Sequence, residues 1–143
     1  MITGGKIVYV EAKREKEGPV AGLGINIGID DVSVKGDAVT VQYTFLADYE
    51  DKVGHLKMTG VIYSSEDKNK AKEIEDMWKK SKKVPEDFAE LMLNTISYTC
   101  GVNGTFVAQP VRLSPPMQMP MVKVEMPPAE KKDKPKKPEK GVT

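Results

Sequence analysis

Histidine and cysteine are almost absent from this sequence of 143 residues, which has only His55 and Cys100 of these two types. One cysteine cannot form a disulfide within the chain, and one residue of each type cannot build a Cys/His metal site. The sequence therefore predicts no zinc or iron–sulfur site and no disulfide chemistry. It also indicates no cofactor.

Long apolar runs are absent as well. The longest has only a few residues, as in Ile7–Val10, whereas a membrane-spanning helix needs roughly 20. The first residues lack the basic segment and the apolar stretch of a signal peptide. We therefore expect a cytoplasmic protein with no membrane partner.

Glutamine, asparagine and cysteine are scarce, whereas charged residues, mostly lysine and glutamate, make up 30% of the chain. This balance is typical of proteins from hyperthermophiles. We therefore expect a thermophilic source, and a melting temperature in the mesophile range would contradict that expectation.

A strong net charge is also missing, because the total is only +1. Residues 129–143 hold six lysines and three acidic residues, hence +3, which leaves 16 basic and 18 acidic residues, hence −2, in the rest. Such a body lacks the basic footprint of a nucleic-acid-binding protein, so nucleic acid is not an expected partner. Lys79–Lys83 beside Trp78 could contact nucleic acid, but a solvated helix end with Trp78 in the core is the simpler interpretation.

Catalytic patterns are missing too. Asp30 and Asp31 are neighbours in a strand and point to opposite faces, and the acids at 50–51 lie in a polar loop. The glycines at 22–24 and 101–104 do not lie between a strand and a helix with the spacing of a phosphate-binding loop. Cys100 lies next to the expected C-terminal end of a helix, where the dipole disfavours a thiolate, so we interpret it as a small core residue. The sequence predicts no catalytic and no cofactor-binding residue.

What the sequence does contain is four segments with the period of two that β-strands show. The alternation slips by one residue at Asp30-Asp31, which predicts a β-bulge. Short connections favour an antiparallel sheet, with a meander as the simplest strand order and a crossover as the alternative. The segments are Lys6–Lys13, Leu23–Val34, Val39–Phe45 and His55–Tyr63.

Two amphipathic helices are expected after the strands. Ser64-Ser65, followed by two acids, predicts the N-cap of the first helix, which should end in the lysines at 79–83. Pro85 suits the first turn of the second helix, and Gly101 predicts its end. The sequence thus indicates an α+β fold in which a four-stranded antiparallel sheet is followed by two helices.

The C-terminal part divides into two segments. Residues 105–108 are expected to be extended, and residues 110–126, which are rich in proline and methionine, are expected to form an extended stretch that belongs to a single domain of residues 1–126. Residues 127–143 are dominated by proline and lysine, which predicts a disordered tail.

The order of these elements resembles that of the bacterial secretion chaperone SecB and small archaeal look-alikes. The residues that carry the resemblance are Gly60–Tyr63 at the end of the fourth strand, Pro85 with Phe88, Leu91, Asn94 and Ile96 in the second helix, Gly101, and Val111–Pro116. The resemblance covers residues 5 to 120. It implies a SecB-like fold, assembly into dimers or tetramers, and apolar grooves that bind unfolded chains. The second helix departs from the bacterial pattern in Glu86–Glu90, and the tail is not acidic, which argues against carrying over translocase binding.

Two surfaces are the candidates for such binding. Every second residue from Gly22 to Gly28 is glycine or asparagine, which leaves one strand face nearly bare for a partner copy or for a helix of the same chain. A row of methionines and valines lies outside the expected core and suits adaptable contacts. The candidate interface or peptide-binding residues are Gly22, Gly24, Asn26, Gly28, Met117, Met119, Met121 and Val122.

The sequence therefore predicts a non-catalytic, oligomeric binding module, with chaperone-like binding of extended or unfolded polypeptide as the leading hypothesis. A dimeric structural or regulatory interaction protein is the main alternative. A small-molecule enzyme with a pocket that no motif reveals is a third.

Overall fold

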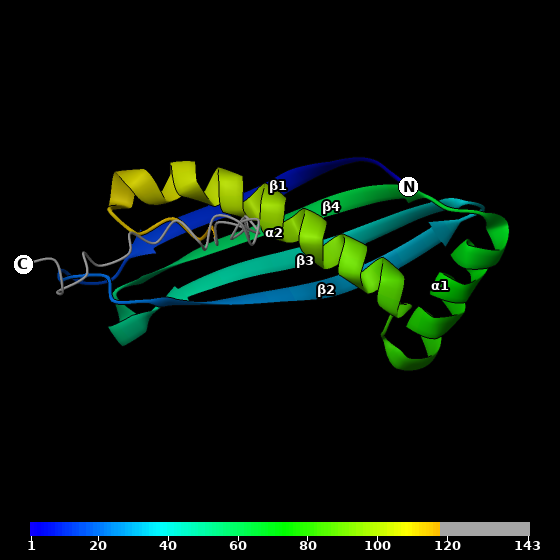
Figure 1. The fold of residues 1–143 in the computed structure, drawn as a ribbon, viewed down its shortest axis with the longest axis horizontal. Helices are drawn as coiled ribbons and strands as arrows, with labels where there is room; N and C mark the ends of the chain where they lie inside the picture. The colour runs from blue at the N-terminus through cyan, green and yellow to red at the C-terminus, as the bar shows by residue number, and fades with distance from the viewer. Residues whose placement is uncertain (118–143) are drawn as a thin grey trace, which may run out of the picture.

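A four-stranded antiparallel sheet and two helices make up the computed structural model, which describes residues 1–117 (Figure 1). The predicted α+β class is confirmed. The strands are β1 (Ile2–Arg14), β2 (Leu23–Lys35), β3 (Ala38–Tyr49) and β4 (Gly54–Ser65). The helices are α1 (Lys68–Ser81) and α2 (Glu86–Ala108), and two short 3-10 turns, η1 (Glu50–Lys52) and η2 (Gln109–Val111), complete the list.

The strand order across the sheet is β1-β4-β3-β2. The last three strands form consecutive hairpins, but β1 pairs with β4, so the meander is wrong for the first connection and the crossover is right. Residues 15–22 cross the end of the sheet over roughly 14 Å, or three strand spacings. Eight residues can span that distance as easily as they can close a hairpin, so the length of the connection did not distinguish the two orders.

The bulge expected at Asp30-Asp31 is present. The register of β2 against β3 shifts between Ile29 and Asp31, and the alternation then continues with Val32 paired to Val41. The shift keeps both halves of this long edge strand with their apolar side chains toward the helices.

The N-cap of helix α1 lies two residues beyond the expected Ser64-Ser65. These serines complete β4 instead, and the N-cap is Asp67, whose side chain accepts a hydrogen bond from the backbone N–H of Lys70 at 2.8 Å. The helix ends at Ser81, and its C-cap, Lys82, adopts a left-handed conformation.

Replacing this cap should weaken α1. We expect Asp67→Ala to lower the free energy of unfolding by about 1 kcal/mol, because one backbone N–H of the first turn loses its acceptor. Chemical denaturation followed by circular dichroism measures the change. Asp76→Ala, in the exposed middle of the same helix, is the control; an equal loss in both variants would contradict the role of the cap.

Helix α2 continues past Gly101 to Ala108, so the expected stop is wrong, as is the extended conformation expected for residues 105–108. Gly101 and Gly104 are buried, because the chain turns back after η2 and packs on them. A Cβ on Gly104 would come within 2.6 Å of Pro116 Cγ. These glycines therefore permit close packing of a returning segment and do not end the helix.

The core lies between the helices and one face of the sheet. Its largest fully buried side chains come from the two central strands, β3 and β4, and from both helices. They are Phe45, Leu56, Met58, Ile74, Met92 and Ile96. The opposite face of the sheet carries no helix in the part of the chain that the structure describes. The domain is thus a two-layer structure with one bare sheet face (Figure 1).

Candidate apolar groove between α2 and β2

Helix α2 crosses the sheet obliquely, so that it runs from the β2 side at its N-terminus toward β1 at its C-terminus (Figure 1). This crossing leaves the apolar row of β2 incompletely covered. Ile25, Ile27 and Ile29 point toward the helical layer and pack against the core, yet they remain only half-buried. Two hollows lie along this row, one after the other, and together we call them the α2–β2 groove.

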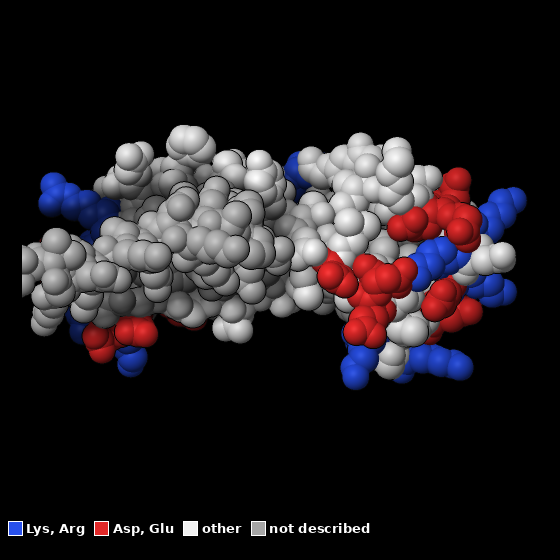
Figure 2. Space-filling view, in the orientation of Figure 1, with Lys and Arg blue, Asp and Glu red and all other residues white. Residues whose placement is uncertain are grey.

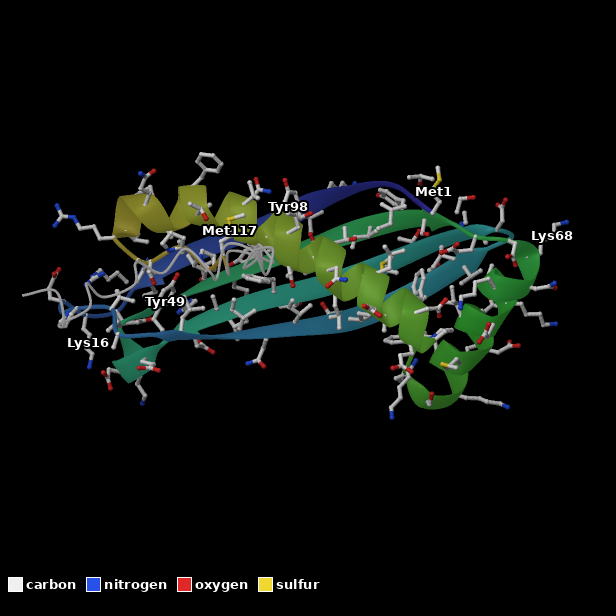
Figure 3. All side chains as sticks on the ribbon, in the orientation of Figure 1. Met1, Lys16, Tyr49, Lys68, Tyr98 and Met117 are labelled. Atoms are coloured by element: carbon white, nitrogen blue, oxygen red, sulfur yellow. The ribbon has the colours of Figure 1, made fainter. Side chains whose placement is uncertain are left out.

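The first hollow has a volume of ≈ 440 Å³ and is mostly apolar. Ile25 and Phe45 form its floor on the sheet, and Asn94, Ser97 and Tyr98 of α2 form one wall. Tyr98 is 71% exposed, which is a high exposure for an aromatic side chain. Pro116 and Met117 close the end of the hollow, and Figure 3 shows Tyr98 and Met117 together at the middle of α2.

The second hollow, of ≈ 350 Å³, continues toward the N-terminus of α2. Ile27 and Ile29 line it from β2, and Ala89 and Leu93 line it from α2. Its far end is built by Trp78, Lys82, Lys83 and Val84, and the ammonium group of Lys82 lies 5.3 Å from the centre of the Trp78 ring. The hollow is therefore apolar along its length and positively charged at one end.

Residues 112–117 form the end of the groove at the first hollow. The backbone reverses at Arg112, which has a positive φ of 55° and whose carbonyl oxygen accepts a 2.7 Å hydrogen bond from Arg14 Nη1. The buried Tyr49 hydroxyl then donates a hydrogen bond to the Ser114 carbonyl. These contacts fix where the chain enters the first hollow.

The titratable groups of residues 1–117 are paired in ways that support structure. His55 Nε2 lies 2.9 Å from Glu11 Oε2 on the bare sheet face, and this hydrogen bond lowers the pKa of Glu11. Lys70 Nζ lies 2.7 Å from Asp87 Oδ1, which raises the pKa of Lys70 and lowers that of Asp87 and ties α1 to the start of α2. Neither pair lines the groove.

Cys100 is buried in the middle of α2, one helical turn before Gly104, and not at a helix end. Its Sγ lies 4.0 Å from the Tyr43 hydroxyl. Burial raises the pKa of the Cys100 thiol to about 11 and raises the pKa of Tyr43 as well. The interpretation of Cys100 as a small core residue agrees with this position.

A buried thiol with such a pKa should not react in the native protein. At pH 8 we expect a thiol-specific reagent to modify Cys100 at least 100-fold more slowly in buffer than in denaturant, since less than about 1% of the thiol is ionised and access is blocked. Release of thionitrobenzoate from Ellman's reagent measures both rates. Rapid reaction in buffer would mean that α2 opens readily from the sheet.

Within residues 1–117, no group of three or more His, Cys, Asp or Glu side chains could hold a metal ion, and no helix there is long and apolar enough to span a membrane. Charged side chains gather at the α1 end of the face shown in Figure 2. A wide depression of ≈ 630 Å³ at that end is lined by side chains of α1 alone, most of them polar or charged, together with Met77.

No family model matches the chain, and no curated protein matches its sequence. Among solved structures, the chain is similar to the SecB-like chaperone Rv1957 of Mycobacterium tuberculosis, which was solved in complex with a ChAD peptide from the Rv1956 HigA1 antitoxin. The TM-score is 0.57 at 10% identity, over 85% of this chain and 90% of that chain. The fold is SecB-like. The resemblance expected from the order of the elements is thereby confirmed at the level of the fold.

In this SecB-like domain, Met117 lies on the helical side of the sheet, and the row from Gly24 to Gly28 lies on the opposite face. Gly24, Asn26 and Gly28 are exposed on the bare sheet face, and a Cβ on Gly24 would have no heavy atom within 4 Å. The alternative that a helix of the same chain covers them is wrong for the described residues. Gly22 lies at the end of the row, beside the side chain of Glu50.

Of the predicted methionine and valine row, only Met117 is within the described part, and it lines the groove. Met119, Met121 and Val122 lie outside the described residues, as does the expected tail at 127–143. Tyr98 and Leu93 were not predicted as site residues, because both lie off the helical stripe that points to the core. The sequence feature that could have indicated them is the presence of large side chains on the face of the second helix that was expected to point away from the core.

Proposed function

We propose that this domain is a non-catalytic binding module that holds extended polypeptide in the α2–β2 groove. The observation that carries the proposal is the half-buried row of Ile25, Ile27 and Ile29 beside an exposed aromatic and an exposed leucine of α2. Such apolar surface is costly to leave in water unless a partner covers it. The SecB-like chaperone of similar fold was solved with a bound peptide, which supports the proposal.

The geometry suits a strand-like partner. β2 is an edge strand, so the N–H and C=O groups on one side of its backbone pair with no other strand of residues 1–117. A peptide that pairs with this edge presents every second side chain to the two hollows. Backbone hydrogen bonds would give affinity without sequence preference, and the hollows would select apolar side chains.

Aggregation of a chemically denatured model protein on dilution tests this function. We expect the full chain at an equimolar ratio to suppress light scattering by the diluted protein. An unrelated soluble protein of similar size is the control. Unchanged scattering at several-fold excess would contradict the proposal.

We further propose that the protein is a cytoplasmic homo-oligomer, a dimer or a tetramer. Two observations support association: the bare row at Gly24–Gly28, and the outer strand β1, where Val8, Tyr9 and Val10 are 58%, 47% and 45% exposed. An edge strand with exposed apolar residues pairs readily with another copy. Light scattering of the full chain gives the mass, and that of one 15.8 kDa chain would contradict the proposal.

A further inference from the structure

The described chain ends inside the groove. Pro116 packs on Gly104, and the next residue, Met117, packs on Gly101, with its Cγ 3.5 Å from the position of an added Cβ. The segment therefore runs antiparallel to α2, toward the helix N-terminus. A chain that continued in this direction beyond Met117 would run along the groove from the first hollow toward the second.

The sequence after Met117 has the pattern of a groove occupant. Val122, Val124 and Met126 alternate with Lys123 and Glu125, so an extended chain would present one apolar face. Met119 and Met121 precede them, and methionine side chains adapt to irregular hollows.

We propose that residues 119–126 bind in the α2–β2 groove of their own chain and compete there with other polypeptides. This inference rests on the proposed function, because it names a resident occupant of the same site. The segment is a built-in competitor that an incoming extended chain must displace.

Length and charge support this assignment. The groove follows α2 from Gly101 to Ala89, roughly 18 Å at 1.5 Å per residue, and ends at Lys82 and Lys83. Eight extended residues beyond Met117 cover roughly 26 Å. That distance brings Glu125 to the two lysines, where a carboxylate meets positive charge.

A tethered competitor need not bind tightly to matter. The effective concentration of a segment joined by a short linker is of the order of 1 mM. A segment with an intrinsic dissociation constant of about 0.1 mM would thus occupy the groove for most of the time and weaken the binding of other peptides about tenfold.

Cross-linking in the full chain tests the location. In a Cys100→Ala background, Ser81→Cys is combined with Pro127→Cys, which leaves Glu125, Lys82 and Lys83 in place, and the chain is treated with a short bismaleimide. We expect cross-links within single chains at a yield at least fivefold above that of the matched pair Ser81→Cys with Glu139→Cys. Equal yields, or cross-links only between chains, would overturn the inference.

Peptide affinity gives a second test that does not need the cysteine variants. The double variant Val122→Asp/Val124→Asp of the full chain should bind a fluorescent extended apolar peptide about tenfold more tightly than the unaltered chain, with Val142→Asp as the control. Unchanged affinity would overturn the inference and leave the proposed function intact. If neither protein binds the peptide, the proposed function fails, whereas the cross-linking result still decides where the segment lies.

Discussion

Gly60→Val should lower the free energy of unfolding by about 3 kcal/mol or more, which corresponds to a fall in melting temperature of about 10 °C. A Cβ on Gly60 would come within 2.6 Å of Tyr43 Cζ and 2.7 Å of the Lys6 carbonyl oxygen. Tyr43 is only 2% exposed, so its ring has no space to move into. The Lys6 oxygen is a backbone atom of β1, so it can move only if the strand moves. The substitution therefore forces apart the pairing of β1 with β4.

Urea denaturation followed by circular dichroism measures this loss, and hydrogen exchange locates it in β1. Gly4→Val is the matched control, because Gly4 lies on the same strand pair and an added Cβ would meet only Tyr63 Cδ2, at 3.9 Å. The control should be within about 0.5 kcal/mol of the unaltered chain. A loss of equal size in both variants would mean that any side chain on these strands is destabilising and that the contact with Tyr43 is not the cause.

In the Val122→Asp/Val124→Asp background, which removes the proposed competing segment, Leu93→Asp should weaken the binding of an extended apolar peptide at least about tenfold. A bound peptide would cover the exposed part of Leu93 in the second hollow, and burial of a carboxylate there costs more than the 1.4 kcal/mol that a tenfold change represents. Isothermal calorimetry with the full chain measures the affinity. The substitution lies on the surface, so the melting temperature should change little.

Leu91→Asp supplies a closely matched control. Leu91 is 41% exposed and Leu93 40%, and both lie in the first half of α2, but only Leu93 lines a hollow. The same charge on the same helix at the same exposure should therefore leave peptide affinity unchanged at position 91. Equal losses in the two variants would place the binding surface elsewhere or trace the effect to net charge.

Much of the fold could be predicted from local patterns. The alternation of Ile25 to Ile29 gave the strand and its inner face, and the slip at Asp30 gave the bulge, because a period of two is a property of the strand itself. The side of the sheet on which β1 pairs is not a local property, so the crossover could not be distinguished from a meander.

The error at the end of α2 has a tertiary cause. Glycine often ends a helix, yet here the returning Pro116 and Met117 cover Gly104 and Gly101, and tertiary packing outweighs the local preference. The same return of the chain creates the first hollow. The groove therefore could not be predicted from the sequence, although the methionine row that begins at Met117 pointed to its end.

The emission of Trp78 tests the central claim most directly, because Trp78 is the only tryptophan of the chain and it lines the second hollow. An extended apolar peptide without tryptophan is titrated into the full chain that carries Val122→Asp/Val124→Asp, so that the proposed competing segment does not occupy the groove. If polypeptide binds in the α2–β2 groove, Trp78 emission should change saturably in this chain and in its Leu91→Asp variant, and the titration of its Leu93→Asp variant should need at least about tenfold more peptide. Binding seen by calorimetry that leaves Trp78 emission unchanged would contradict the account.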